Sequence, residues 1–180
     1  MNQLFKGDVT NNVVELNLQA GATNIGTPTV AYDGASNGVI NQITGDVPPN
    51  WENSDSSLYG LVIGTSCTAI GSLAFYYCTG LTGSLVFPDS VTSIGDQAFD
   101  NCTGFTGTLT FGNGVTVIGS SSFYDCTSIT SVSILATSAP TIGSNAFNGM
   151  TSVSPAEIHV PVGATGYAAS YDGLTVVYDL

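Results

Sequence analysis

The chain has almost no positive charge. Among its 180 residues there is one Lys or Arg, Lys6, against 13 Asp and Glu. Nucleic acids and anionic lipids are held mainly by clustered Lys and Arg side chains. A net charge of −12 therefore argues against a nucleic-acid partner. The acidic surface is expected mostly to keep the protein soluble.

Long apolar runs are also missing. No stretch approaches the roughly 18 consecutive apolar residues that a membrane-spanning helix needs, so membrane insertion is not expected. The segment from Met1 to Lys6 lacks the apolar core of a signal peptide. We therefore expect either that a leader has been removed or that the protein reaches the outside by another route, such as assembly into a virus particle.

Residues that commonly carry out catalysis or bind metals are scarce. His159 is the only His, and no Ser or Cys is placed with it as in a catalytic triad. The aspartates do not form a calcium loop, and the cysteines lack the paired Cys-x-x-Cys spacing of a zinc site. We predict no catalytic residue, no metal, no cofactor, and a protein that is not an enzyme.

A repeated motif dominates the chain instead. An Ile-Gly pair is followed at constant distances by Ala or Ser, Phe, Cys or Met, and Thr. The pairs begin at Ile70, Ile94, Ile118 and Ile142, a constant period of 24 residues. A period of this length is typical of solenoids, in which each unit buries its apolar side only by stacking on the next unit.

Each unit predicts two strands and a turn. An alternating segment such as Leu85-Val86-Phe87 predicts a strand with its middle side chain outward, and a shorter strand should end at each Ile of the Ile-Gly pairs. The Gly-x-x-Ala-Phe part predicts a short helical or 3₁₀ turn, with Gly where the backbone bends or approaches a neighbour. Three buried columns should result: Ile70/Ile94/Ile118/Ile142, Phe75/Phe99/Phe123/Phe147 and Cys78/Cys102/Cys126/Met150.

The ends of the chain do not follow the repeat. Residues 1–46 lack the 24-residue pattern but alternate in apolar character at 14–18, which predicts a β-rich cap or attachment segment. Two prolines in 46–52 indicate a boundary, with Trp51 expected to pack over the first coil. Residues 47–180 then form the solenoid, closed by a C-terminal cap at 161–180 that is expected to contain a turn or short helix and a final strand. One residue lost after Cys126 is regained before Ile142, so the register should recover.

The run Pro88-Asp-Ser-Val-Thr-Ser-Ile-Gly-Asp-Gln-Ala-Phe-Asp-Asn-Cys-Thr103 resembles a BspA-type leucine-rich repeat, a family of bacterial surface proteins also found in some protists and phages. The run 158–164, followed by Tyr167 and Tyr171, is similar to the closing segment of that family. The resemblance covers about residues 58–180. It implies a mainly β, right-handed leucine-rich-repeat solenoid, here with a β-rich N-terminal cap, that serves adhesion or recognition outside the cell. The location would be a bacterial surface, the secreted fraction or a virion surface.

Two rows of variable residues are candidate binding sites. The first row lies at the two positions before each Cys of the column and combines aromatic area with hydrogen-bonding groups: Tyr76, Tyr77, Asp100, Asn101, Tyr124 and Asp125. The second row is the outward position of successive strands: Val86, Thr110, Ser133 and His159. Ordinary solvated turns and strand surfaces are the alternative interpretation of both rows.

The leading hypothesis is a non-enzymatic recognition or adhesion module that binds a protein or glycan on a cell or virion surface. The alternative is a structural component of a virion or surface assembly, such as a decoration, connector or fibre protein. It would dock through residues 1–46 or the repeat edge and could form a homo-oligomer. A Thr row at Thr68, Thr92 and Thr116, interrupted at Pro140, leaves ice binding as a further hypothesis. The cysteines are expected to be buried thiols, because stacked parallel side chains suit a disulfide poorly.

Overall fold

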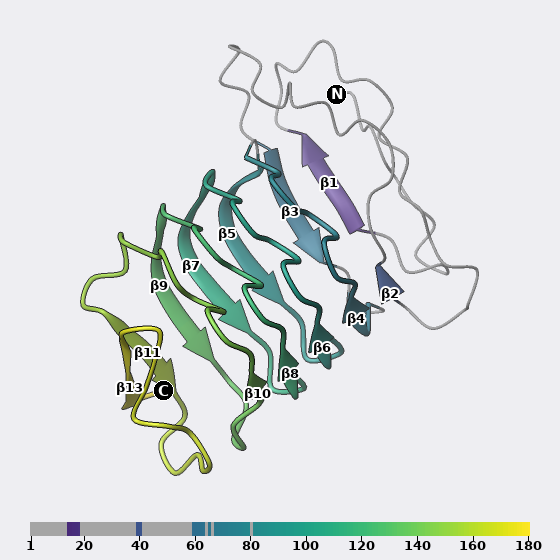
Figure 1. The fold of residues 1–180 in the computed structure, drawn as a ribbon. Helices are drawn as coiled ribbons and strands as arrows, with labels where there is room; N and C mark the ends of the chain where they lie inside the picture. Colours follow the sequence, from purple (N-terminus) through teal and green to yellow (C-terminus); the bar gives the residue numbers. More distant parts are fainter. Residues whose placement is uncertain (1–13, 19–38, 41–58, 64, 66, 80) are drawn as a thin grey trace.

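The computed structural model describes residues 14–18, 39–40, 59–63, 65, 67–79 and 81–180. It shows a mainly β solenoid of about four coils, with no helix among the described residues, so the predicted fold class is confirmed (Figure 1). Each coil has three sides: a long strand, a short strand and a series of turns. The two sides made of strands stack into separate sheets.

The long strands form an eight-stranded sheet. Its inner part, from β3 to β13, is parallel, while β1 pairs antiparallel with β3 and β12 pairs antiparallel with β13. In sheet order the strands are β1 (Val14–Leu18), β3 (Tyr59–Ile63), β5 (Leu81–Phe87), β7 (Phe105–Phe111), β9 (Ile129–Ile134), β11 (Glu157–Val160), β13 (Leu174–Tyr178) and β12 (Ser170–Tyr171).

The short strands form a second, five-stranded parallel sheet. They are β10 (Thr141–Ile142), β8 (Val117–Ile118), β6 (Ser93–Ile94), β4 (Ala69–Ile70) and β2 (Val39–Ile40). Ile70 aligns with Ile94, Ile94 with Ile118, and Ile118 with Ile142. The predicted Ile column is therefore confirmed by the register. The one-residue loss in the third coil is regained before Ile142, also as predicted, because β7 and β9 are offset by one residue less than β8 and β10.

Phenylalanine fills the interior in two columns. In the predicted column the ring centroids of Phe75 and Phe99 are 4.8 Å apart and those of Phe99 and Phe123 are 5.3 Å apart, with nearly parallel planes. A second column, Phe87 and Phe111, meets the first edge to face, with 5.3 Å between the centroids of Phe111 and Phe123. Such contacts add roughly 0.5–1.5 kcal/mol per pair to the effect of burial. The core is therefore continuous along the solenoid axis.

The Gly of each Ile-Gly pair lies where two coils touch. A Cβ on Gly119 would lie 2.5 Å from the carbonyl carbon of Gly95 and 2.6 Å from the amide nitrogen of Asp96. Real side chains do not tolerate such distances from backbone atoms, so only Gly fits. Of the two reasons that the sequence suggested for this Gly, the structure shows the close approach of a neighbouring coil.

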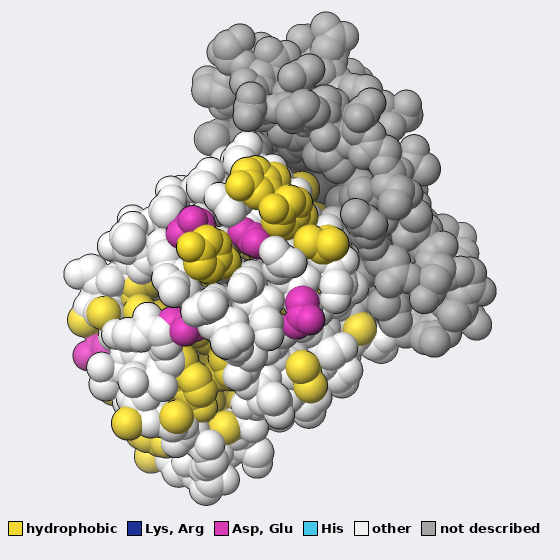
Figure 2. Space-filling view, viewed as in Figure 1, with side chains coloured by type: hydrophobic (Ala, Val, Ile, Leu, Met, Phe, Trp, Pro, Cys, Tyr) yellow, Lys and Arg dark blue, Asp and Glu magenta, His cyan; other side chains and the backbone are white. Residues whose placement is uncertain are grey.

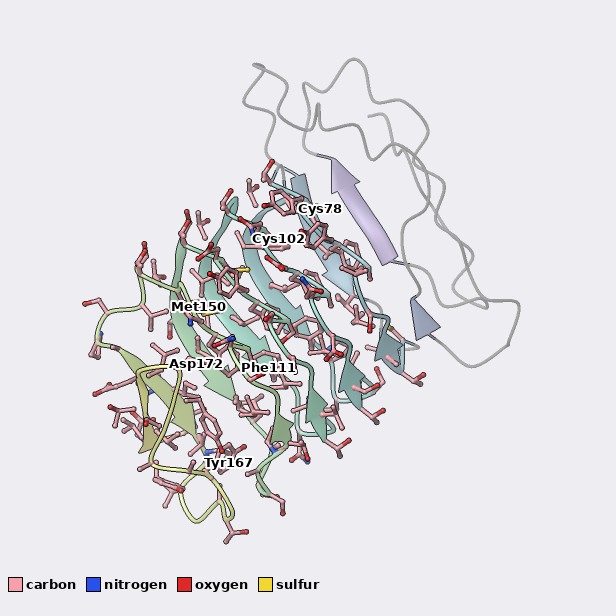
Figure 3. The ribbon with its side chains drawn as sticks, viewed as in Figure 1. Cys78, Cys102, Phe111, Met150, Tyr167 and Asp172 are labelled. Carbon is pink, nitrogen blue, oxygen red and sulfur yellow. The ribbon has the colours of Figure 1, made fainter. Side chains whose placement is uncertain are left out.

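The C-terminal segment closes the last coil. In each earlier coil the amide of the column Phe donates to a carbonyl one coil further on, as Phe123 N does to Ala146 O at 2.9 Å. No further coil follows Phe147, and its amide donates to the carboxylate of Asp172 at 2.9 Å (Figure 3). Tyr167 also donates its hydroxyl hydrogen to Ala136 O at 2.7 Å. One carboxylate thus replaces the carbonyl of a missing coil.

At the other end, β1 and β2 extend the two sheets. The rest of residues 1–46, the proline-containing boundary 46–52 and Trp51 lie outside the described residues. The strand predicted from the alternation at 14–18 is present as β1. Within 161–180 the predicted final strand is β13, and the turn that the sequence left open as a short helix is not helical.

Candidate functional site

The third side of each coil is a chain of turns, which we call the turn face. It comprises residues 71–79, 95–103, 119–127 and 143–151. Alternate amides bond differently: Tyr76 N donates to Leu73 O within the coil at 3.3 Å, whereas Tyr77 N donates to Asp100 O of the next coil at 2.9 Å. The expected helical or 3₁₀ turn is therefore wrong. The backbone instead changes between right-handed and left-handed conformations, and every second amide donates to the neighbouring coil.

The reversal of hand occurs at two columns of positive φ. One column contains Leu73, Gln97, Ser121 and Asn145. The other contains Tyr77, Asn101, Asp125 and Gly149, with φ of 58°, 59°, 51° and 85°. Asn, Asp and Gly are the residues that adopt this conformation most readily. The backbone thus accounts for three members of the second column, and Tyr77 is the member it does not account for.

The neighbouring column brings Tyr76, Asp100 and Tyr124 together. Tyr77 N donates to Asp100 O at 2.9 Å and Asn101 N donates to Tyr124 O at 2.8 Å, so the three residues lie on successive coils. Tyr76 and Tyr77 are 45% and 56% exposed, and their rings meet edge to face at 4.7 Å. Tyr124 is half-buried. In Figure 2, exposed hydrophobic side chains lie beside acidic ones amid uncharged polar surface.

Asp100 is a buried residue on the coil between those of Tyr76 and Tyr124. It is only 5% exposed, and its two carboxylate oxygens accept hydrogen bonds from Gln97 Nε2 at 3.0 Å and from Asn101 Nδ2 at 2.6 Å. Partial desolvation, the charge of Asp100 and the neighbouring Tyr77 raise the pKa of Tyr76 above its ordinary value. The sequence placed Asp100 on the surface row but carried no signal of its burial.

The second candidate row runs across the long sheet. Val86 aligns with Thr110, Thr110 with Ser133, and Ser133 with His159. Nδ1 of His159 lies 2.9 Å and 3.0 Å from the two carboxylate oxygens of Asp179. The sequence did not suggest this pair, which joins β11 to the C-terminal cap. The row lies on strands and the turn face on turns, so the two candidate surfaces are separate.

The cysteines serve the core. All four are free and buried, as expected, and Cys78, Cys102 and Met150 follow one another along the stack (Figure 3). Cys102 Sγ donates to Phe75 O at 3.0 Å, and burial raises the pKa of the Cys78 and Cys126 thiols to about 12. A thiol with such a pKa is not an activated nucleophile at neutral pH. The described residues contain no cluster of His, Cys, Asp and Glu that could hold a metal ion.

The threonine row supports the coils directly. Thr116 Oγ1 donates to Thr92 O at 2.9 Å, and Thr92 Oγ1 donates to Thr68 O at 3.1 Å. The hydroxyl hydrogens of Thr92 and Thr116 therefore tie each coil to the one before it. This structural role explains the recurrence of Thr without the ice-binding hypothesis.

Residues 52–169 match the family model described as BspA type leucine rich repeat region, in six copies. This span is more than half of the chain. The protein belongs to the BspA-type leucine-rich repeat family. No curated protein and no solved structure matches the chain. Six copies exceed the four complete motifs seen in the sequence, because the match also extends over both flanks of the Ile-Gly series.

BspA-type repeats are often surface or protein-binding modules, and solenoids of this kind are typically non-enzymatic binding scaffolds that are exposed or secreted. Leucine-rich repeats generally mediate interactions with proteins. Nothing in the described part of the chain forms a helix with the length and apolarity that a membrane span requires. The coarse class is thus a repeat scaffold for interactions.

Proposed function

We propose that this BspA-type repeat protein is a non-enzymatic recognition module that binds a partner protein or glycan through its turn face. The observation that carries the proposal is the exposed pair Tyr76 and Tyr77, next to Tyr124 and a buried carboxylate on the adjoining coils. Tyr is enriched in binding surfaces because it offers large, rigid contact area at a small entropic cost.

The backbone beneath these residues supports this role. The amides of Leu73, Phe75 and Tyr77 all donate to the next coil, at 3.0, 2.7 and 2.9 Å. Phe75, between the exposed tyrosines and the core, is itself buried and stacked on Phe99. A surface held in this way loses little freedom on binding, so more of the contact energy remains as affinity.

Tyr77 adds an argument from conformation. A bulky residue with φ of 58° is unusual, and the left-handed region costs a non-Gly residue roughly 1–2 kcal/mol. Leu73 shows that this backbone tolerates a large side chain at positive φ, but Leu73 is half-buried whereas Tyr77 is mostly exposed. An exposed ring gains little from packing to offset that cost, which is consistent with selection for binding.

The proposal is tested with a glycan array and an array of surface-protein ectodomains. The wild type is compared with the triple variant Tyr76→Ala/Tyr77→Ala/Tyr124→Ala. Tyr178→Ala is the matched control, because Tyr178 is also 45% exposed but lies on β13, at the far end. We expect the triple variant to bind the wild-type hits at least about tenfold more weakly, equivalent to about 1.4 kcal/mol, and the control to bind unchanged. Equal binding by all three proteins would remove the turn face from the site.

The strand row of Val86, Thr110, Ser133 and His159 remains a second predicted surface. Val86→Ser and His159→Ala test it on the same arrays. We also propose an extracellular location, on a bacterial surface, in the secreted fraction or on a virion, in keeping with what is typical of the family. Treatment of intact cells or particles with protease should then remove the protein, and full protection would contradict this location.

A second candidate function is a structural component of a larger assembly. It is favoured by the C-terminal end, where Val162 and Leu180 are exposed and Val162 N donates to Leu180 O at 3.1 Å. An apolar group of this kind at the end of a stack suits contact with another subunit. Light scattering separates the two functions: a defined trimer or larger ring supports assembly, and a clean monomer supports the free recognition module.

A further inference from the structure

We propose that the turn face selects a cation, and that its partner is a basic protein segment whose Lys or Arg side chain lies against Tyr76 and Tyr124, above Asp100. This inference rests on the proposed function and names the chemistry of the ligand. Three features of the described residues support it: an uncompensated charge, its position on the coil between those of two tyrosines, and the sign of the surrounding electrostatic field.

The first feature is the charge of Asp100. Asp100 is a buried residue, 5% exposed, and the hydrogen-bond donors to its carboxylate are the neutral side-chain amides of Gln97 and Asn101. No Lys or Arg lies among the described residues, because the single one in the chain is Lys6. Burying a charge is costly unless an opposite charge accompanies it. A cation from a partner would supply what the described part of the chain does not.

The second feature is the placement of the rings. Tyr76 lies one coil before Asp100 and Tyr124 one coil after it. Since each strand step is about 4.8 Å, the two tyrosines are separated by roughly 10 Å along the stack. That distance admits one side chain between them. Ring faces attract ammonium and guanidinium groups within about 6 Å, and Tyr is among the better rings for this contact.

The third feature is the field around the site. Asp96 and Asp125 lie on the same turn face, and the whole chain has a net charge of −12. Desolvation and the charge of Asp100 raise the pKa of Tyr76, so the negative charge of Asp100 acts on the exposed ring. Such a field draws cationic partners and repels anionic ones. A neutral glycan would gain nothing from it, so the observations favour a basic protein segment.

The test uses three labelled peptides of one length and a Gly-Ser framework that contain, respectively, two Arg, two Gln or two Glu. Binding to the full chain is measured by fluorescence anisotropy. We expect the Arg peptide alone to bind, and its Kd to rise at least about tenfold in Asp100→Asn and in Tyr124→Ala. Raising NaCl from about 50 mM to about 500 mM should weaken it by a similar factor, because salt screens the peptide's charge from the less buried carboxylates of Asp96 and Asp125.

Two controls separate the site from the overall charge. Asp89→Asn removes the same charge elsewhere and keeps the oxygen that accepts from Asn113 N, and Tyr178→Ala removes an equally exposed ring elsewhere. Both should change Kd less than about twofold. Equal weakening by Asp89→Asn and Asp100→Asn would mean attraction to net charge alone and would overturn the inference. Thermal unfolding of each variant confirms that the fold is kept.

The outcome also distinguishes this inference from the function on which it rests. If a neutral glycan or an uncharged peptide binds, and Tyr124→Ala weakens it while Asp100→Asn does not, cation selection is overturned and the recognition face stands. If the tyrosine variants bind every probe as the wild type does, the recognition face itself is overturned.

Discussion

Ser122 offers a sharp test of the stacked-column description. It belongs to the column Ala74, Ala98, Ser122 and Ala146, and it is 0% exposed. Its hydroxyl has no hydrogen-bond partner among the described residues. A buried hydroxyl without a partner costs about 1–3 kcal/mol of folding free energy. Ser122→Ala should therefore stabilise the protein.

The expected gain is about 1–2 kcal/mol, toward the lower end of that range because Ser122 belongs to the turn face. No cavity opens, since Ala already occupies the same place in the three other coils. The backbone contacts persist, because Ser122 O accepts from Phe99 N and Ser122 N donates to Gly119 O whichever side chain is present. For a chain of this length, about 1 kcal/mol corresponds to roughly 2–4 °C in Tm.

Urea unfolding followed by circular dichroism measures the difference, with Tm as a second readout. Ala98→Ser is the reciprocal variant and should lose a similar free energy, since Ala98 is also fully buried. Ser144→Ala, on an exposed residue of the turn face, is the neutral control and should stay within about 0.5 kcal/mol. A loss of stability in Ser122→Ala would refute the reasoning, because it would mean that the hydroxyl is satisfied in the folded protein.

Three other predictions concern the ends, the contacts between coils and the thiols. Asp172→Ala should lower the free energy of unfolding by about 1 kcal/mol because the Phe147 amide loses its acceptor, while Asp172→Asn keeps an oxygen and should lose less in urea titrations. Gly119→Ala should cost more than about 2 kcal/mol, since a Cβ would meet the backbone of the previous coil, and a Tm near the wild-type value would contradict that contact. Burial raises the folded pKa of Cys78 and Cys126 from 9.0 to about 12, so the unfolded chain releases these protons first. Stability should thus be intact below pH 9 and fall between pH 9 and 12, less steeply in a double Cys→Ala variant; equal slopes would mean that the thiols do not contribute.

The columns of the core could be predicted because they depend on a local rule. When coils of constant length stack, residues one period apart become neighbours whatever lies between them. The Ile-Gly spacing therefore predicted that Ile70 would align with Ile94, and the Phe spacing predicted the stack of Phe75 on Phe99. The same rule covered the compensated loss of one residue near Cys126.

The backbone conformation of the turn face was not predicted from the sequence. Ala and Phe suggested a helical turn, yet the backbone reverses its hand twice in each coil. The series Tyr77, Asn101, Asp125 and Gly149 contained the signal, since three of these residues favour positive φ. From the sequence, the variation suggested either recognition or an ordinary solvated turn, and not a requirement for positive φ. Tyr77, the aromatic residue in the series, obscured the conformational pattern. Tyr77 is also one of the two exposed tyrosines on which the functional proposal rests.

The sequence by itself determined most of the architecture: the period, the residues that face inward and the scarcity of basic residues follow from spacing and composition. The resemblance of the repeat motif indicated the family, which the match over residues 52–169 shows. The tertiary structure alone decided that Asp100 is buried and which groups the polar side chains meet. The carboxylate of Asp100 accepts from the side-chain amides of Gln97 and Asn101, Asp172 replaces the carbonyl of a missing coil, and His159 pairs with Asp179. The physical reason is that burial and hydrogen bonding depend on atoms brought close in space by neighbouring coils and the C-terminal cap, and no single period in the chain encodes those distances.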